Sequence, residues 1–574
     1  MRLSAYSRQP LGACLVALAA ALTAASSWAG DKPQADADTR AALAAITSER
    51  LLQHIRVLSS DTFEGRLPAT HGEALTLAYL VREFRRLGLE PADKAGNYVQ
   101  IVPMTGFRSQ VDVDYTVHGS STVLKSPEDY VAWSSDRRRH LQIKDSPLIF
   151  VGYGVQAPEY QWDDYKGLDL HGKTLVMLIN DPPIPDPQHQ GELDPAMFGG
   201  KAMTYYGRWT YKYETAARLG AAAAIIIHET GPAAYPYSVV VNSWSAEHYV
   251  LRNRGRDPDF PPVAGWMTLE RARELFNRSG LDFDALKERA RSRDFRPVEL
   301  GARISLDVHN AWHEVESHNV VARIPGSDAA RAAETVVYSA HWDHFGWRPQ
   351  LGGPKSQQVF HGAQDNASGT AALLVLAAAF KALPQPPARS VLFLATTSEE
   401  QGLLGARYYA RHPLFPLRDT VADLNMDGIN PLGRTRDVEI IGLGKSDMDD
   451  RAAAAAAAQG RVAVPDAHPE RGSFFRADQF EFARVGVPGL YISNGLDFIG
   501  KPPDYGETKR SEFIAKRYHQ VGDVIQPDWT LEGGAQDVQL LWRVGFELAN
   551  SASFPKWKAG SEFKARRDLQ RPGD

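Results

Sequence analysis

The sequence TVVYSAHWD at residues 335–343 decides how this chain folds. Six residues suited to a buried strand, Thr335 to Ala340, end directly at His341. A short, mostly apolar and β-branched run is typical of a strand inside a parallel sheet, which is buried on both faces. In open sheets of alternating strands and helices, ligands bind outside the carboxyl ends of the strands. We therefore expect His341 at a functional edge of such a sheet.

Two later strands place acidic residues in the same way. The strand expected over 390–396 is followed after a short turn by Glu399 and Glu400, and the strand expected over 421–426 is followed directly by Asp427. Helical patterns lie between these strands. The alternation predicts an α/β fold in which helices cover both faces of one sheet.

Five side chains in this region are candidate metal ligands: His341, Asp365, Glu400, Asp427 and His519. Imidazole together with carboxylate is a usual ligand set for a catalytic zinc. A carboxylate can also bridge two metal ions, and two-metal sites of this kind are typical of aminopeptidases. Manganese or cobalt would suit the same oxygen-rich set, because such sites discriminate poorly between these metals. The ligands predict a hydrolytic metal site.

Neighbours of these ligands have candidate roles in the chemistry. Glu399 is well placed to take a proton from an attacking water and return it to the leaving amine. Asp343, two residues after His341, is a candidate to orient that imidazole. The roles of two nearby histidines, His344 and His361, stay open.

The 574 residues are too many for one ordinary domain. Between the helical pattern of residues 40–90 and the α/β region, strand candidates at 148–151 and 173–179 and a helix at 212–219 suggest a small β-rich insert. We expect five segments: a signal peptide at 1–29, the N-terminal part of the main domain at 30–119, the insert at 120–296, the main part at 297–560 and a C-terminal tail at 561–574.

The first 29 residues resemble an export signal. Arg2 and Arg8 precede the apolar stretch 11–25, and Ser27-Trp28-Ala29 fits a cleavage site. An uncleaved membrane anchor is the alternative, but the apolar stretch is short for one. We expect a periplasmic or secreted protein with no stable membrane span after cleavage near Ala29.

The composition excludes several classes of protein. The only cysteine, Cys14, lies in the expected signal, so disulfides and thiolate metal sites are excluded from the mature chain. The net charge of -5 argues against a nucleic-acid binder. The sequence gives no indication of oligomeric state.

The strings AHWDHFG, GAQDNASGTAALL, TTSEEQGLLGARYY, LNMDGIN and YHQVGD together resemble the co-catalytic di-zinc aminopeptidase family, which includes glutamate carboxypeptidase II and the transferrin receptor. The resemblance covers most of residues 317–525 and extends to residues 40–90. It implies a zinc exopeptidase-like mixed sheet flanked by helices. Residues 120–296 are similar to the protease-associated domain that many relatives insert, from which Arg208 or Tyr206 is a candidate to reach the cleft.

The resemblance also implies a role for each ligand. His341 and Asp427 would bind one zinc ion, Glu400 and His519 a second, and Asp365 would bridge the two. Glu399 would be the general base and acid, and Asp343 would support His341. Tyr518 matches a position that stabilises the oxyanion in some relatives, although a packed aromatic is an equal alternative. Asp478 falls where relatives carry Ser-Asp-His, but Gln479 departs from that pattern and leaves its role open.

The expected reaction is hydrolysis of N-terminal residues from peptides with a free N-terminus. A carboxypeptidase or another amide hydrolase on the same centre is the first alternative, and a cationic pocket for a free carboxylate would favour it. A one-zinc transferase of the glutaminyl cyclase type fits less well, because the full two-metal set is present. A non-catalytic binding protein of the transferrin receptor type would have replaced ligands, and none is replaced here.

Overall fold

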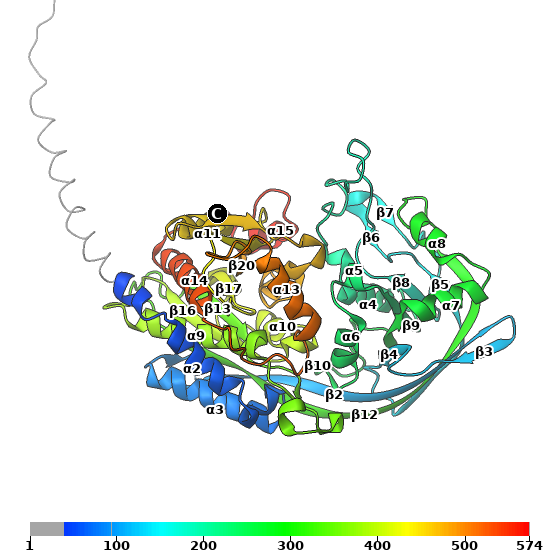
Figure 1. Ribbon diagram of the computed structural model, residues 1–574, viewed down its shortest axis with the longest axis horizontal. Helices are drawn as coiled ribbons and strands as arrows, with labels where there is room; N and C mark the ends of the chain where they lie inside the picture. The colour runs from blue at the N-terminus through cyan, green and yellow to red at the C-terminus, as the bar shows by residue number, and fades with distance from the viewer. Residues whose placement is uncertain (1–38, 93–94, 573–574) are drawn as a thin grey trace, which may run out of the picture.

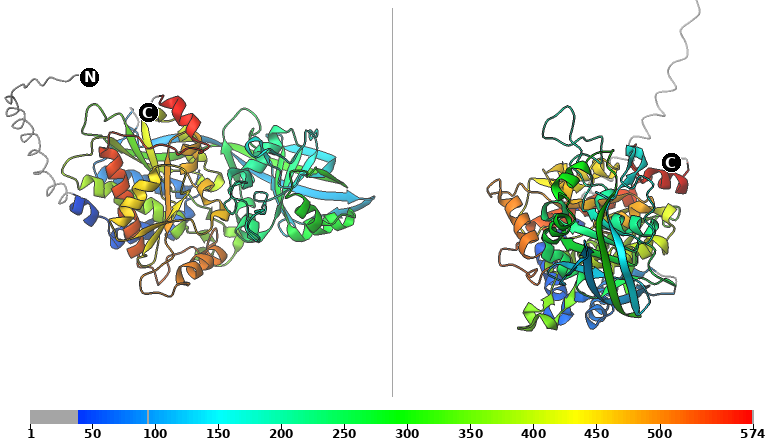
Figure 2. Two further views of the ribbon diagram at one scale, coloured as in Figure 1. Left: turned by 90° about the horizontal axis from the view of Figure 1, so that it is seen from above. Right: turned by 90° about the vertical axis from the view of Figure 1, so that its right-hand side faces the viewer.

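The structure is a computed structural model that describes residues 39–92 and 95–572. The expected signal peptide at 1–29, with Cys14, lies outside the described residues. The chain forms two lobes side by side, and one continuous sheet runs through both of them (Figure 1). The view from above in Figure 2 shows the lobes arranged along the long axis of the molecule.

The first lobe contains the alternating strands and helices expected from the sequence. Its strands lie in the order β19 (Val462–Pro465), β18 (Asp437–Ile441), β20 (Gly489–Asn494), β17 (Thr420–Asn425), β13 (Thr335–His341), β16 (Ser390–Thr396) and β12 (Val298–Ile324). β13 is parallel to both β16 and β17, and β17 is parallel to β20. β12 and β18 run antiparallel to their neighbours β16 and β20, so the sheet is mixed as expected.

Helices cover both faces of this sheet because its central strands are apolar on both sides. Val336 and Tyr338 face a core formed with α2 (Ser48–Leu58), α3 (His71–Arg86), α9 (Ser368–Lys381), α11 (Met448–Ala457) and α14 (Glu532–Asn550). Val337, which points the other way, packs with residues of α10 (Leu404–Arg411) and α12 (Gln479–Arg484). The buried run that begins at Thr335 therefore lies at the centre of a three-layer lobe.

Two long strands connect the lobes. β2 (Val99–Val117) pairs antiparallel with β12 from Val99↔Val320 to Val117↔Ala302. Figure 1 shows this ribbon as a curved band beneath both lobes. The sequence predicted only the start of β2, at 98–102, and no strand over 298–316. Side chains in the second half of the ribbon alternate between buried and exposed, which is the pattern of a half-buried antiparallel pair.

The second lobe contains the expected strands together with several helices. β5 (His140–Phe150), β8 (Thr174–Leu178), β9 (Ala223–His228), β11 (Val263–Thr268) and β4 (Tyr130–Trp133) continue the sheet. Its helices are α4 (Trp209–Arg218), α5 (Thr230–Ala233), α6 (Tyr237–Trp244), α7 (Leu269–Arg278) and α8 (Phe283–Arg289). Separate hydrophobic cores lie on the two faces of this part of the sheet. The boundaries of the insert at 120 and 296 stay a prediction.

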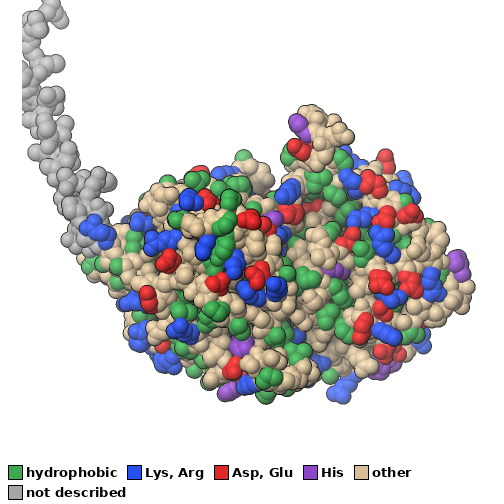
Figure 3. Space-filling model, in the orientation of Figure 1, with side chains coloured by type: hydrophobic (Ala, Val, Ile, Leu, Met, Phe, Trp, Pro, Cys, Tyr) green, Lys and Arg blue, Asp and Glu red, His purple; other side chains and the backbone are tan. Residues whose placement is uncertain are grey.

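Within the described residues, none of the helices has the length and apolar character needed to cross a bilayer. Basic and acidic side chains are interspersed over the face shown in Figure 3, in keeping with the small net charge.

Candidate metal centre

Three neighbouring parallel strands bring two candidate ligands and the candidate base to one edge of the sheet. His341 is the last residue of β13, Asp427 follows the end of β17 by two residues, and Glu399 follows the end of β16 by three. The carboxyl ends of parallel strands share one edge, so residues distant in sequence meet there. The expected clustering is what the structure shows.

A tight turn presents Glu399 and Glu400 together. Both lie in the short 3-10 helix η7 (Glu399–Gln401), between Ser398 and Leu403, whose φ angles are 53° and 60°. Residues other than glycine rarely adopt such angles, and these conformations cluster at functional sites. The Glu399 amide donates to Asp343 Oδ1 at 3.1 Å, which fixes the turn against the loop that follows His341.

Asp365 lies at the middle of the cluster and faces both candidate histidines. Its Oδ1 is 3.3 Å from His341 Nε2, and its Oδ2 is 3.4 Å from His519 Nε2. His341 Nε2 is also 3.1 Å from Asp427 Oδ1, and His519 Nε2 is 3.1 Å from Glu400 Oε2. Ligand atoms bound to a tetrahedral zinc at about 2.0–2.2 Å lie roughly 3.3 Å apart, so this donor set fits metal ions.

His519 reaches the centre from the segment after α13 (Tyr505–Lys516). Its φ of 54° is in the left-handed region. Two residues of α6 in the second lobe hold it: Ser243 Oγ is 3.2 Å from His519 Nδ1, and Asn242 Nδ2 donates to the His519 carbonyl at 3.0 Å. The second lobe therefore contributes to the orientation of a candidate ligand, which no sequence signal indicated.

The electrostatic field of the cluster is negative. Although burial opposes it, the Glu400 and Asp365 carboxylates raise the pKa of His519 to about 9. Burial, and then the nearby Asp427 and Glu400 carboxylates, hold the pKa of Glu399 well above its usual range against the influence of His341. A group of buried carboxylates of this kind needs positive charge nearby, which metal ions would supply.

Glu399 lies next to the ligand candidates without being the nearest to either histidine. Its Oε2 is 3.9 Å from His341 Nε2, and its side chain lines both of the cavities that meet at the centre. It is thus placed between the candidate ligands and the space available to a substrate.

Further side chains position the candidate ligands. Asp343 is close to His341 as expected, with its backbone carbonyl 3.3 Å and its carboxylate 3.7 Å from Nδ1. His344 Nδ1 lies 2.6 Å from Glu400 Oε1, so it contacts the ligand candidate through that oxygen. Asp523 accepts the backbone N–H of Asp365 at 3.0 Å. Asp523 ends the YHQVGD string, so its proximity to His519 in sequence was the signal that could have identified it.

A buried arginine fixes the loops on either side of the centre. Arg66 donates to the carbonyls of Trp342 at 2.8 Å, His361 at 2.7 Å and Gly362 at 2.9 Å, and also to that of Leu58 at 2.7 Å. Burial lowers its pKa to about 10, so the guanidinium stays charged at neutral pH beside the acidic cluster. This arginine was not among the residues expected from the sequence to serve the site.

The remaining candidates have different surroundings. The centroids of the Tyr518 and His519 rings lie 3.8 Å apart. Burial raises the pKa of the Tyr518 hydroxyl well above its usual range. Asp478 accepts a hydrogen bond from Thr396 and lines neither cavity. His361 points to Asp61, with 2.7 Å between Nε2 and Oδ1.

Two cavities meet at the centre, where Glu399, Tyr518 and His519 line both. Arg208, one of the two residues named as candidates to reach the cleft, lines the second cavity. Tyr206 does not line either cavity, and its hydroxyl donates to Glu159 at 2.6 Å.

Part of the chain is similar in sequence to known proteins. Residues 319–542 match the model of peptidase family M28. A vacuolar membrane protease from Clavispora lusitaniae is 31% identical over 119 residues, which are 21% of this chain and 10% of that protein. Aminopeptidase NAALADL1 from Mus musculus is 33% identical over 132 residues, which are 22% of this chain and 16% of that protein. The match thus spans only a small part of these curated relatives.

A solved structure shares the fold. The aminopeptidase from Aneurinibacillus sp. strain AM-1 superposes with a TM-score of 0.51 at 17% identity, covering 90% of this chain and 97% of that one.

Proposed function

We propose that the protein is a metal-dependent exopeptidase of peptidase family M28, whose model residues 319–542 match, and specifically an aminopeptidase that uses two zinc ions. His341 and Asp427 would hold one ion, Glu400 and His519 the other, and Asp365 both. Peptides with a free N-terminus would be the substrates. We also propose export, with cleavage near Ala29, and a protease-associated insert over residues 120–296.

One observation carries the two-metal proposal. Asp365 directs one carboxylate oxygen to His341 and the other to His519, at 3.3 and 3.4 Å. A carboxylate that serves a single ion has no need of an imidazole on each side. The arrangement is the one that a bridging ligand requires.

The chain's own residues supply the remaining chemistry. Zinc ions, when bound, would polarise the scissile carbonyl and lower the pKa of a water molecule. Glu399 would take a proton from the attacking water and pass it to the leaving amine. The neutral Tyr518 hydroxyl would donate a hydrogen bond to the developing oxyanion. Ser243 and Asp343 would keep His519 and His341 in the orientation for binding.

The decisive test of the proton carrier is Glu399→Gln. We expect kcat on an aminoacyl substrate to fall by about 10²–10⁴-fold, because the amide cannot accept the proton. Metal content and KM should stay close to wild type. Glu562→Gln, at an exposed ion pair with Lys445, is the matched control. Near-wild-type turnover with unchanged metal content would make the assignment of the base wrong.

A second candidate function, cleavage next to a free carboxylate, is favoured by Arg208. Its side chain is buried in the second cavity with Glu399 and Glu400, and no hydrogen bond or ion pair of its guanidinium is recorded within residues 39–92 and 95–572. Burial, followed by the charge of Arg476, lowers its pKa to about 10, so it remains a cation at neutral pH. Arg476 lines the same cavity. A substrate carboxylate would satisfy both guanidinium groups.

Blocked substrates distinguish the two functions. An aminopeptidase should lose activity when the N-terminus is acetylated, whereas a carboxypeptidase should lose it when the C-terminus is amidated. If Arg208 binds a substrate carboxylate, amidation should raise KM by about 10–100-fold, and Arg208→Met should remove that difference. Equal cleavage of acetylated and free peptides would exclude the aminopeptidase.

A further inference from the structure

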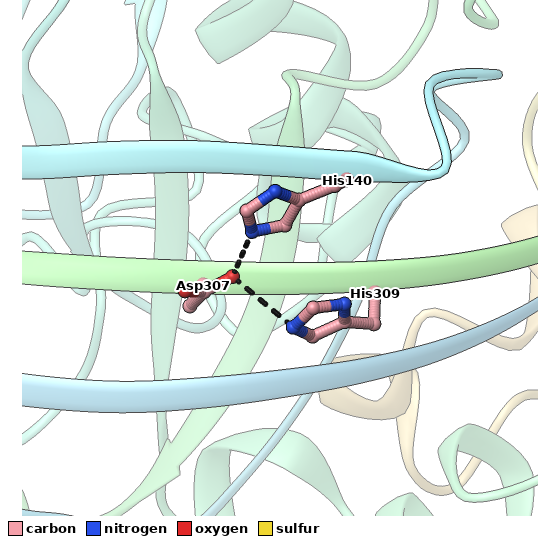
Figure 4. A group of neighbouring side chains, drawn as sticks. All are labelled: His140, Asp307 and His309. Carbon is pink, nitrogen blue, oxygen red and sulfur yellow. Dashed lines mark hydrogen bonds and ion pairs between the residues drawn. The ribbon is translucent and has the colours of Figure 1, made fainter.

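A second group of metal-type side chains lies on the outer face of the connecting ribbon, in the second lobe. His140 begins β5, and Asp307 and His309 lie two residues apart on β12. In the register of these strands His140 is opposite His309. All three side chains therefore lie on one face of the sheet, as Figure 4 shows. The alternate residues of β12, such as Leu306 and Val308, point into the core.

The three side chains converge on one oxygen atom. His140 Nε2 lies 2.6 Å and His309 Nε2 lies 3.5 Å from Asp307 Oδ1. The two imidazole rings are stacked, with centroids 4.7 Å apart and planes 11° apart. The atoms facing each other are thus two imidazole nitrogens and a carboxylate oxygen, all within 4.8 Å of one another, which is near enough for one metal ion to bind all three after small side-chain movements.

A neighbouring side chain orients the carboxylate. Gln142, opposite Asp307 on β5, donates from Nε2 to Asp307 Oδ2 at 2.8 Å. Because Oδ2 is held in this way, Oδ1 is left to the two histidines. Orientation of a ligand by an outer hydrogen bond is common at metal sites.

A negative charge on β2, the strand that flanks β12 on the edge away from β5, also favours a cation. Asp112 on β2 is directly opposite Asp307. Like charges opposite each other in a sheet are destabilising. Among the described residues, no ion pair is recorded for Asp112 that would offset this repulsion. A bound cation would relieve the repulsion and provide Asp112 with a counter-charge.

We propose that His140, Asp307 and His309 bind one divalent transition-metal ion, of the class of Zn²⁺, Ni²⁺ or Cu²⁺, at a site separate from the candidate catalytic centre. Imidazole and carboxylate donors suit these ions, and solvent water would fill the remaining positions. The ion would join β5 to β12, so it would stabilise the second lobe rather than act on peptides. The proposal does not depend on the proposed peptidase function.

The test measures Zn²⁺ stoichiometry in the full chain. Wild type and a His140→Gln/His309→Gln double variant are saturated with Zn²⁺ and freed of excess, and bound zinc is counted by elemental analysis. The double variant should bind one equivalent of zinc fewer than wild type. It should also lose the part of the increase in Tm that Zn²⁺ binding at this site gives the wild type. His189→Gln, at the exposed His189–Asp186 pair with 2.9 Å between Nδ1 and Oδ2, is the matched control and should lose no zinc.

Copper binding gives a second test of this site that does not depend on counting zinc ions. Cu²⁺ added to zinc-loaded protein should give an electron paramagnetic resonance signal with two-nitrogen coupling, which the double variant lacks. Equal zinc content in wild type and the double variant, or a Cu²⁺ signal that persists in that variant, would overturn the proposal. So would a loss of zinc in His189→Gln equal to that in the double variant. Absence of catalytic zinc would lower both counts and leave their difference unchanged.

Discussion

Ser243 on α6 lies 3.2 Å from Nδ1 of His519, so a residue of the second lobe contacts a candidate metal ligand of the first. Histidine ligands usually donate their other ring nitrogen to an oxygen acceptor, which fixes the tautomer and the plane of the ring. Ser243 Oγ is placed to be that acceptor. Loss of an outer partner of this kind typically weakens metal binding without removing the ligand itself.

Ser243→Ala should therefore weaken metal binding by about 10–100-fold and lower turnover at limiting Zn²⁺. Excess Zn²⁺ should restore most of the activity, because the ligands themselves are intact. Titration of the metal-free protein with Zn²⁺, followed by activity, measures the effect. Ser238→Ala, an exposed serine on the same helix, is the control. An unchanged Zn²⁺ titration would show that Ser243 does not orient His519.

Arg66→Lys should destabilise the first lobe and impair the centre together. A lysine cannot reproduce the planar set of donors that serves four carbonyl groups, so several buried acceptors would be left without partners. Each such group costs about 1–3 kcal/mol, and we expect Tm to fall by several degrees. Arg56→Lys, at an exposed position of α2, should leave Tm unchanged. A wild-type Tm for Arg66→Lys would contradict this role.

Metal removal should lower both activity and stability. The buried or partly buried carboxylates of Asp365, Glu399, Glu400 and Asp427 lie together at the centre, and without cations their repulsion is uncompensated. Dialysis against a chelator should abolish hydrolysis and lower Tm. Added Zn²⁺ should raise Tm in a concentration-dependent way. One bound ion at 100 times its Kd should raise the free energy of unfolding by about 2.7 kcal/mol. A Tm that responds to neither chelator nor Zn²⁺ would contradict the metal centre and favour a non-catalytic binding protein.

His248 should make stability depend on pH on the acidic side. Burial lowers the pKa of this histidine from 6.5 to about 4. Its ring stacks on that of Trp133, with 4.4 Å between the ring centroids. Above pH 6.5 the folded and unfolded states are both neutral at this residue. As pH falls from 6.5 to 4 the unfolded state binds a proton that the folded state resists, so about 3 kcal/mol of stability is lost.

His248→Phe keeps the aromatic stack and removes the titrating group. As the pH falls from 6.5 to 4, the variant should therefore lose less unfolding free energy than wild type. Its stability relative to wild type should rise over this range. His171→Phe, at an exposed position, is the control and should show the wild-type slope. Parallel pH profiles for wild type and His248→Phe would show that His248 is not the residue responsible.

The sequence alone predicted the central strands of the first lobe and the edge of the sheet at which three candidate site residues lie. Strands such as β13 and β16 are buried on both faces, so each is a contiguous apolar run that can be recognised locally. Polar residues that directly follow such runs must lie at the carboxyl edge. His341, Glu399 and Asp427 could be placed together for that reason, without knowledge of the packing.

Only the tertiary structure decided which atoms face each other and what holds them there. The two oxygens of Asp365 are directed to different histidines, Ser243 reaches His519 from another lobe, and Arg66 joins loops far away in sequence. The long pairing of β2 with β12 was missed for a related reason. Such contacts depend on the packing of distant segments, whose side chains have no local periodicity that relates one segment to the other.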